Sequence, residues 1–313
     1  NDEFGIFEIG MDKKGEIDNL SKIIKPDVGV ITNISYAHAK NFQNIKQIAR
    51  AKSEIIRNIK NGGSLVLNAD DKFYNFHKKI AKRNKLKVYS FSLKKKSAEV
   101  SLNFIKKEKS KYKIYININN SKFHFYINSN FENKIQNILA TLTILSIFKN
   151  VEKIDKNIFY NHKTPDGRGD ISKINIYKKF FYLIDESYNS NPLSLRSALK
   201  NFDTMKLNHS KKHLILGDML ELGKHSKRLH KEISKIINNT SINTVNVIGK
   251  NIRYAYENLD KSKKGKIINR SSQIIDLIKN KINNNDYLMI KGSNSTGLYK
   301  ISNNLKSGKI NAL

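Results

Sequence analysis

Short apolar runs alternate with helical patterns over the first part of the chain, from residue 4 to about residue 93. The runs are typical of buried strands, and the segments between them carry apolar positions at helical spacing. The predicted elements are a strand at Phe4–Ile9, a helix at Glu16–Ile24, a strand at Val28–Ile34, a helix at Ile45–Ile59 and a strand at Ser64–Asn68. This alternation indicates βαβ units and a mostly parallel sheet.

The pattern changes to strict alternation between residues 98 and 128. Two strands are predicted there, Lys113–Ile118 and Phe123–Ile127, on either side of an Asn119-Asn120 turn. We interpret them as an antiparallel extension of the first sheet. A helix over Lys134–Phe148 follows, and a turn-rich segment at Thr164–Asp170 is the candidate interdomain linker.

The rest of the chain begins with a hairpin and then returns to strand–helix alternation. After the hairpin at Ile171–Ile184 we predict a helix from Pro192, then strands at 212–217, 244–248, 266–268 and 286–291 and helices at 226–237, 251–258 and 272–279. The sequence therefore predicts an α/β protein with two domains, at residues 1–163 and 164–313. The second is expected to be Rossmann-like and doubly wound.

Composition narrows the classes of partner. The formal net charge of +31 suggests a nucleic-acid partner, but the lysines are spread along the whole chain instead of clustering. We therefore expect no nucleic-acid partner, only a field that favours anionic small molecules. The chain has no cysteine and no apolar run that could span a bilayer, so we expect a cytoplasmic protein without membrane insertion.

The predicted first sheet places several chemically active side chains just beyond strand ends, where α/β proteins bind ligands. Glu8 ends the first strand, Asn33 ends the second, and His38 lies in the loop that follows. Lys52 falls on the apolar face of the Ile45–Ile59 helix, an unusual position for an ammonium group. Each of these residues also has a purely structural interpretation, such as a helix cap, a loop histidine or a lysine that reaches solvent.

Three segments around these residues resemble consecutive motifs of the central domain of the Mur ligases, in the family's order. They are Phe7-Glu-Ile-Gly-Met-Asp-Lys-Lys-Gly-Glu-Ile17, Thr32-Asn-Ile-Ser-Tyr-Ala-His38 and Ile48-Ala-Arg-Ala-Lys-Ser-Glu54. The resemblance implies that Glu8 and His38 bind Mg²⁺. It also implies that Lys52 is carbamylated by carbon dioxide and supplies a further oxygen ligand, which makes Lys52 and His38 candidate catalytic residues.

Further motifs imply a nucleotide site. Glu132-Asn-Lys-Ile-Gln-Asn-Ile-Leu-Ala140 resembles the segment whose last asparagine, here Asn137, reads adenine, although Asn133-Lys134 replaces the usual His-Asn pair. Asp166-Gly-Arg-Gly169 resembles the segment whose arginine reaches the ATP phosphates, here Arg168. Leu183-Ile-Asp-Glu-Ser-Tyr-Asn-Ser-Asn-Pro192 follows the family's Asp-Asp-x-Tyr-Asn-Ala-Asn-Pro signature, which places Asp185, Glu186 and Asn189 on the nucleotide side.

Two glycine-containing loops resemble one branch of the family, which adds D-alanyl-D-alanine. They are Leu216-Gly-Asp-Met-Leu-Glu-Leu-Gly223 and Ile290-Lys-Gly-Ser-Asn-Ser-Thr-Gly297, in which Asn294 replaces the branch's arginine. Tight turns after buried strands would explain the glycines but not the charged residues. The resemblance implies a catalytic role for Lys291 and a set of substrate-binding residues, namely Asn33, Asn191, Asp218, Glu221, Ser293 and Ser295.

The activity implied is ATP- and Mg²⁺-dependent addition of D-alanyl-D-alanine to UDP-N-acetylmuramoyl-tripeptide through an acyl phosphate, by a monomeric enzyme. The sequence contains no Gly-x-x-Gly-Lys-Thr/Ser phosphate loop, so we expect that segment to precede Phe4 and this chain alone to be inactive. The alternatives are another ligase of the superfamily, such as a diaminopimelate- or lysine-adding ligase or a folylpolyglutamate synthase, and a non-catalytic nucleotide-binding remnant.

Overall fold

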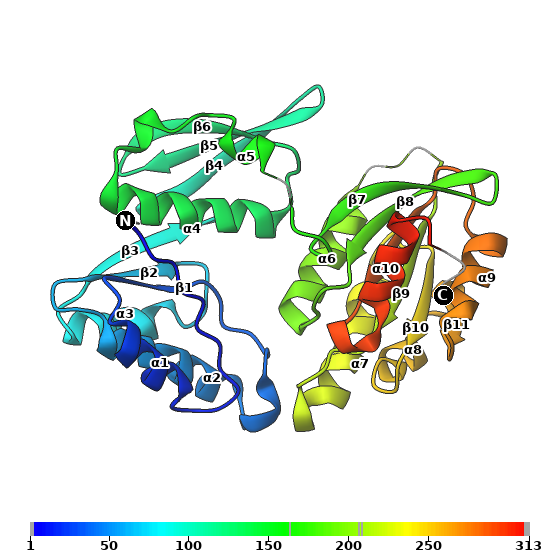
Figure 1. The fold of residues 1–313 in the computed structure, drawn as a ribbon, viewed down its shortest axis with the longest axis horizontal. Helices are drawn as coiled ribbons and strands as arrows, with labels where there is room; N and C mark the ends of the chain where they lie inside the picture. Colours follow the sequence, from blue (N-terminus) through cyan, green and yellow to red (C-terminus); the bar gives the residue numbers. More distant parts are fainter. Residues whose placement is uncertain (1–2, 163, 206, 208, 310–313) are drawn as a thin grey trace. The chain divides into compact units, whose positions relative to one another are not determined.

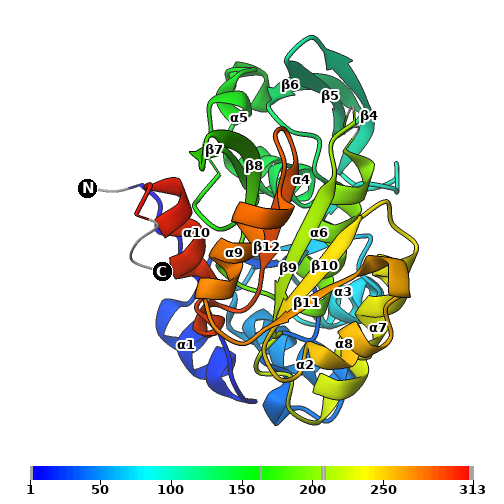
Figure 2. The same ribbon diagram turned by 90° about the vertical axis from the view of Figure 1, so that its right-hand side faces the viewer.

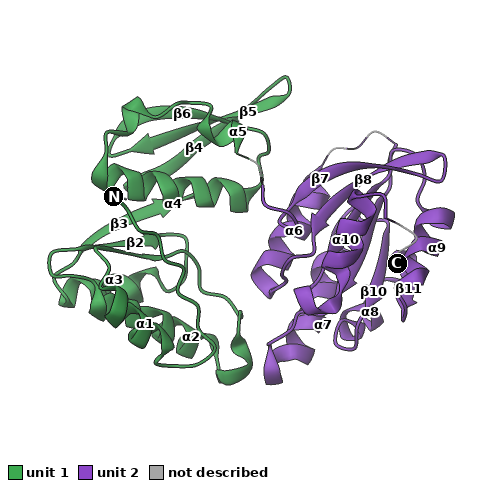
Figure 3. Ribbon diagram, viewed as in Figure 1, with its two compact units in different colours: residues 1–162 green, residues 163–313 purple. Residues whose placement is uncertain are grey.

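The computed structural model describes residues 3–162, 164–205, 207 and 209–309. The chain divides into two compact units, residues 1–162 and residues 163–313, so that the predicted domain boundary lies one residue further along (Figure 3). Each unit contains one six-stranded sheet with helices on its faces, which confirms the predicted α/β class. None of the helices in these described ranges is long and apolar enough to cross a bilayer.

The sheet of unit 1 follows the order of the chain. Its strands are β1 (Val28–Ile31), β2 (Ser64–Asn68), β3 (Lys87–Ser92), β4 (Val100–Glu108), β5 (Lys111–Ile118) and β6 (Ser121–Ile127). Strands β1 to β4 pair in parallel, whereas β4, β5 and β6 form an antiparallel meander. The predicted antiparallel extension is therefore confirmed, and Asn119 and Asn120 form its turn with the positive φ angles that asparagine tolerates.

Helices cover both faces of this sheet (Figure 1). On one side of β1 to β3 lie α1 (Glu16–Ile24), α2 (Ile45–Lys52) and α3 (Tyr74–Arg83), and on the other lies α4 (Glu132–Phe148). The α4 helix buries Ile135, Leu139 and Leu142 against strand residues such as Val66 and Phe91. Three short segments are 3₁₀-helical, at η1 (Ala39–Asn41), η2 (Ser53–Asn58) and η3 (Val151–Lys153), and a one-turn helix, α5 (Ile158–Asn161), ends the unit.

Two predicted elements at the start of the chain differ from the structure. The prediction of a strand at Phe4–Ile9 is wrong, because this segment pairs with no strand in the described part of the sheet. Ile6 and Phe7 are accordingly 98% and 65% exposed. The Ile45–Ile59 helix is α-helical only to Lys52, where the Ser53 hydroxyl donates to the Arg50 carbonyl and the chain tightens into η2.

Unit 2 contains the predicted doubly wound sheet. Its spatial order is β11 (Lys264–Ile268), β10 (Thr244–Ile248), β9 (Lys212–Gly217), β12 (Tyr287–Lys291), β8 (Lys179–Glu186) and β7 (Asp170–Ile176). All neighbours pair in parallel except β7, which forms the predicted hairpin with β8 (Figure 2). The chain runs from β8 to β9 and later returns to place β12 between them. The carboxyl ends of these three strands form the edge at which doubly wound sheets bind ligands.

The helices of unit 2 are α6 (Pro192–Thr204), α7 (Ser226–Asn238), α8 (Arg253–Glu257), α9 (Ser272–Lys281) and α10 (Leu298–Lys306), with 3₁₀ turns η4 (Gly223–His225), η5 (Lys261–Lys263) and η6 (Asn294–Thr296). Residues of α9 and α10, such as Ile274 and Leu298, pack with Phe181, Leu288 and Ile290 of the sheet in one core cluster. The last helix, α10, was not predicted, and it lies against β7, β8 and β12.

Candidate active site

Lys52 in unit 1 is a half-buried lysine whose charge is poorly compensated. It ends α2, and burial lowers the pKa of its ammonium group, while the Glu8 carboxylate lies close enough to oppose that shift in part. The structure thus brings two of the three predicted metal-site residues near each other. Glu8 is exposed and belongs to an irregular segment, not to the end of a strand as we expected.

His77 is a neighbour of Lys52 that sequence reasoning missed. It lies on α3, is 2% exposed, and its Nε2 is 3.1 Å from the Ala49 carbonyl of α2. Burial lowers the pKa of His77, and the Lys52 charge adds to this effect. A neutral histidine and a lysine of lowered pKa therefore lie on adjacent helices. The apolar pattern of α3 alone gave no sign of this.

His38 is positioned by a turn with a positive φ of 52° at the start of η1. Its Nδ1 lies 3.2 Å from Asp12 Oδ1, and 44% of the side-chain surface is exposed. Asp12 also accepts from Asn41 through its backbone carbonyl, at 2.9 Å. The contact that the structure gives for His38 is therefore with Asp12, a residue that the sequence analysis did not single out.

Asn33 lies beyond β1 in a chain of amides across the sheet. Its Oδ1 accepts from Asn68 at 3.1 Å, and its Nδ2 is 3.5 Å from Gln136 Oε1 on α4. Asn137 is the next residue of α4 and is exposed. Asn33 thus lies near the carboxyl ends of β1 and β2, and Asn137 lies in the first half of α4.

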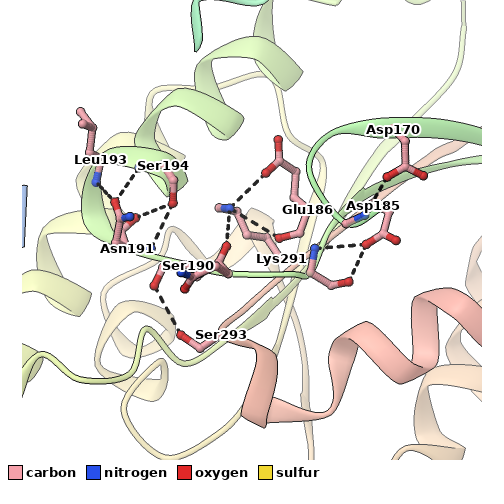
Figure 4. Close-up of polar contacts among 12 residues, drawn as sticks. Asp170, Asp185, Glu186, Ser190, Asn191, Leu193, Ser194, Lys291 and Ser293 are labelled. Atoms are coloured by element: carbon pink, nitrogen blue, oxygen red, sulfur yellow. Dashed lines mark hydrogen bonds and ion pairs between the residues drawn. The ribbon is translucent and has the colours of Figure 1, made fainter. Parts of the chain in front are cut away.

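Lys291 is the central group of unit 2. It ends β12 directly beside Glu186, which ends β8, and the two are register partners in the parallel sheet. The Lys291 ammonium is 1% exposed and donates to Glu186 Oε2 at 3.1 Å and to the Asn189 carbonyl at 3.0 Å (Figure 4). Such a buried ion pair needs further hydrogen bonds to offset desolvation, and the Asn189 carbonyl supplies one.

Asp185 is fully buried beside this pair. Its Oδ1 accepts from the amide and the hydroxyl of Ser187 (Figure 4). Its Oδ2 lies 2.6 Å from the ammonium group of Lys306 on α10. The family signature predicted a role for Asp185 on the nucleotide side but gave no sign of Lys306 as its partner.

Arg168 belongs to the turn after Pro165. Its amide donates to the Pro165 carbonyl at 3.2 Å, and its guanidinium carbon is 4.6 Å from the centre of the Tyr188 ring. The guanidinium is exposed at this cation–π distance, so its five donors keep access to solvent and to an anionic ligand.

Asp218 and Ser293 organise loops within unit 2. The Asp218 carboxylate accepts from the backbone amides of Ile252 at 2.7 Å and Lys250 at 3.2 Å. Ser293 accepts from the Leu220 amide at 2.9 Å through its hydroxyl, and its own amide donates to the Asp218 carbonyl at 3.0 Å. The two glycine-containing loops that the sequence singled out therefore lie side by side.

Buried His230 on α7 fixes the first of these loops. Its Nε2 accepts from the Met219 amide at 3.0 Å, and its Nδ1 lies 2.8 Å from the Ser226 carbonyl. This arrangement assigns the proton to Nδ1. Burial lowers the pKa of His230, which favours the neutral form that the Met219 contact needs.

Asn191 has a structural role in the fold. Its side-chain oxygen accepts from the amides of Leu193 and Ser194 at the start of α6, and Ser194 returns a bond to the Asn191 amide, which completes a capping box. Glu221 and Ser295 are exposed, and Glu221 has a positive φ of 60°.

Family models match both units of the chain. Residues 1–145 match the Mur ligase middle domain, and residues 175–294 match the Mur ligase glutamate ligase domain. The chain belongs to the Mur ligase family.

Relatives and a solved structure of Mur ligases agree with this placement. The chain is 32% identical over 302 residues to the UDP-N-acetylmuramoyl-tripeptide--D-alanyl-D-alanine ligase of Rickettsia prowazekii, which covers 96% of this chain and 65% of that protein. It is 30% identical to the enzyme of the same name from Buchnera aphidicola subsp. Baizongia pistaciae, over 95% of this chain and 62% of the relative. The chain thus spans less than two thirds of the length of these curated relatives.

The fold is shared with a crystal structure of the MurF ligase from Thermotoga maritima in complex with ADP. The TM-score is 0.82 at 20% identity, over 98% of this chain and 67% of that chain. At this identity the likeness concerns the Mur ligase fold alone. It covers both units of the chain.

Proposed function

We propose that this Mur ligase chain is the ATP-dependent amide-forming part of an enzyme that adds D-alanyl-D-alanine to UDP-N-acetylmuramoyl-tripeptide. The observation that carries the proposal is the Lys291–Glu186 pair, which lies at the carboxyl ends of β12 and β8 next to the two loops linked by Ser293. In a doubly wound sheet this is the position of the ligand crevice. Curated relatives that match 95% or more of this chain are named for this reaction.

The nucleotide side of the proposal rests on unit 2. ATP supplies the phosphoryl group that activates the peptide carboxylate for attack by an amine. Arg168 presents a permanently charged fork suited to phosphate oxygens, and the partly exposed Glu186 lies at the end of β8, where a ribose hydroxyl would find an acceptor. Asp185, which is fully buried beside Glu186, is proposed to hold this strand end in place. Asn137 on α4 is proposed to read the adenine edge with its amide.

The metal side rests on unit 1, and its residues fit Mg²⁺ only after a modification. An ammonium group cannot bind a cation, but the lowered pKa of Lys52 increases the fraction of neutral amine that can react with carbon dioxide. The resulting carbamate offers oxygen atoms, the ligands that Mg²⁺ prefers, near the Glu8 carboxylate. His38, which precedes η1 and contacts Asp12, is the third proposed ligand, on the strength of the family motif alone.

The decisive experiment measures phosphate release from ATP by the full-length protein, with UDP-N-acetylmuramoyl-tripeptide present. We expect release to require D-alanyl-D-alanine and to be at most slight with D-alanine, lysine or diaminopimelate as the amine. Lys52→Met is expected to reduce turnover by about 100-fold or more, because an aligned metal ligand is lost. The exposed Lys60, which pairs with Asp27, provides the control variant Lys60→Met.

Two results would contradict the proposal. Equal phosphate release with a single amino acid and with the dipeptide would exclude the assigned amine substrate. Turnover of Lys52→Met equal to that of the Lys60→Met control would contradict the proposed role of Lys52 in metal binding.

A further inference from the structure

The last helix of unit 2 places one ammonium group among three carboxylates. Lys306 Nζ on α10 lies 2.5 Å from Asp170 Oδ2, 2.6 Å from Asp185 Oδ2 and 3.8 Å from Asp166 Oδ1. The Lys306 side chain is 17% exposed, and Asp185 is completely buried. Neither the established family membership nor the motifs of the sequence assigned a role to this lysine.

The electrostatics show that Lys306 is held as a cation. Burial alone would lower the pKa of Lys306, but the close ion pairs with Asp170 and Asp185 outweigh this effect, so the pKa is raised. Without this cation, three carboxylates from the linker turn, β7 and β8 would lie close together with one of them buried. Mutual repulsion would then separate the turn from the strand end.

A second side chain of α10 acts on the same turn. Tyr299 packs edge-on against Tyr188, with ring centres 5.9 Å apart, and Tyr188 in turn stacks under the Arg168 guanidinium. Gly167 lies against both tyrosines and has a φ of +74°. A Cβ added to Gly167 would come within 2.8 Å of Tyr188 and 3.1 Å of Tyr299. Only glycine fits such a close approach at this φ.

Backbone hydrogen bonds complete the attachment of the turn to unit 2. The Gly169 amide donates to the Asp185 carbonyl at 2.7 Å, the Gly167 amide donates to Asp170 Oδ1 at 2.9 Å, and the Tyr188 amide donates to the Gly167 carbonyl at 3.1 Å. Asp170 and Asp185, whose carboxylates form ion pairs with Lys306, are therefore the same residues that accept hydrogen bonds from the turn. A shift of Asp170 or Asp185 would move Arg168 as well.

We propose that α10, through Lys306 and Tyr299, positions Arg168 and Asp185 for the nucleotide. Lys306 is thus a positioning residue and not a catalytic one, because it acts only through the residues it holds. This inference rests on the proposed function for its kinetic consequences, but its structural consequence can be measured without turnover. Figure 4 shows Asp170 and Asp185 facing the same side of β7 and β8.

The test compares three variants of the full-length protein. Lys306→Met removes the cation, Lys306→Arg keeps it with a fork that can reach two carboxylates, and Lys300→Met changes an exposed lysine of the same helix. We expect Lys306→Met to raise the KM for ATP by about tenfold and to leave the KM for D-alanyl-D-alanine within about twofold. In Lys306→Arg both KM values should remain within about threefold of those of the unmodified enzyme. Lys300→Met should change neither KM value.

Hydrogen exchange of the 313-residue chain supplies the second measurement. The amides of Gly167, Arg168 and Gly169 should exchange faster in Lys306→Met, whereas the strand amides of β9 and β10 should be unchanged. Tyr299→Leu provides an independent variant with a milder effect on the same amides, in case Lys306→Met does not fold.

The outcomes separate the two proposals. Absence of any ATP-dependent turnover in the unmodified enzyme would refute the proposed function, while faster exchange at the turn would still support the positioning role. Unchanged exchange at the turn in both Lys306→Met and Tyr299→Leu would overturn the inference. So would an equal rise in the KM values of ATP and the dipeptide, since that is the result of a general loss of structure.

Discussion

Each of the two units contains a half-buried lysine near at least one carboxylate, but the pKa values of these two lysines shift in opposite directions. In unit 1 burial dominates at Lys52, and its pKa falls because the exposed Glu8 compensates only in part. In unit 2 the Asp170 and Asp185 carboxylates contact Lys306 directly, and its pKa rises. Burial therefore does not determine the state of a lysine; the number and distance of its carboxylate partners decide it.

This difference matches the chemistry proposed for each unit. A lysine that readily loses its proton is suited to react with carbon dioxide, and a lysine held as a cation is suited to fix neighbouring residues. Lys291 resembles Lys306 in its contacts, because its ammonium lies at hydrogen-bonding distance from the Glu186 carboxylate and from the Asn189 carbonyl. We therefore expect replacement of Lys291 to cost much more folding stability than replacement of Lys52.

The largest effect is expected for Lys291→Met, which leaves Glu186 without its cation in a nearly buried site. Removing one partner of a buried ion pair typically costs about 3–5 kcal/mol of stability. Denaturant unfolding of the chain should show this loss, and Lys291→Met combined with Glu186→Leu should recover a large part of it. A single variant as stable as the unmodified chain would contradict the compensated charge that we assign to unit 2.

Acidification should destabilise unit 2 more than unit 1. Burial lowers the pKa of two fully enclosed histidines in unit 2, His213 and His230, but of only one in unit 1, His77. The pKa of His124 in unit 1 is lowered as well, by burial and by Lys113, but His124 is partly exposed and solvent screens its charge. Below the unfolded-state pKa of about 6.5 the unfolded chain binds more protons, so stability falls by about 1.4 kcal/mol per pH unit for each histidine until the folded-state pKa is reached. Hydrogen exchange measured in β9 and in β2 between pH 7 and pH 5 compares the units, and an equal loss in both would contradict this ranking.

A smaller effect is expected at the start of α6, where Asn191 caps the helix. Asn191→Ala removes the acceptor for two backbone amides and should cost about 1 kcal/mol, whereas Asn191→Asp or Asn191→Ser should retain most of the stability. Thermal unfolding measures this series. If Asn191→Ala reduces turnover at unchanged stability, the residue also binds substrate, as the family motif implies.

The smallest effect on stability is expected for Lys52→Met. The change removes a charge that burial disfavours, so stability should stay within about 0.5 kcal/mol or increase slightly, even though turnover is lost. Unfolding curves of Lys52→Met and Lys291→Met, recorded together, contrast the two kinds of lysine directly. A loss for Lys52→Met as large as that for Lys291→Met would show that the two charges are equally compensated.

The sequence determined much of the fold and the chain positions of the candidate residues, but not their partners. Periodicity gave the Glu16–Ile24 helix and the Ser64–Asn68 strand with their observed bounds, because each has a single apolar pattern between clear turn signals. The Phe4–Ile9 prediction failed because apolar alternation indicates a strand only where a neighbouring strand can pair with it. Contacts between distant residues could not be predicted from local patterns either. The Glu54 carboxylate, for example, accepts from the Gly15 amide at the start of α1, 39 positions earlier in the chain.

Partners in the site depend on the tertiary fold in the same way. Lys306 follows a polar stretch of α10 and has no feature in the sequence that distinguishes it from the other lysines of a lysine-rich chain. Its role appears only when α10 lies against β7 and β8. Asp185, by contrast, was located by its motif, because a strand end followed by a tight turn is a local property.

The central claim is that unit 1 keeps Lys52 ready for carbamylation, and ¹³C NMR of the chain in ¹³C-bicarbonate tests it most directly. We predict a carbamate carbon signal that disappears in Lys52→Arg and persists in Lys306→Arg and Lys60→Arg. A spectrum without any carbamate signal from the folded chain, or a signal that survives in Lys52→Arg, would contradict the account.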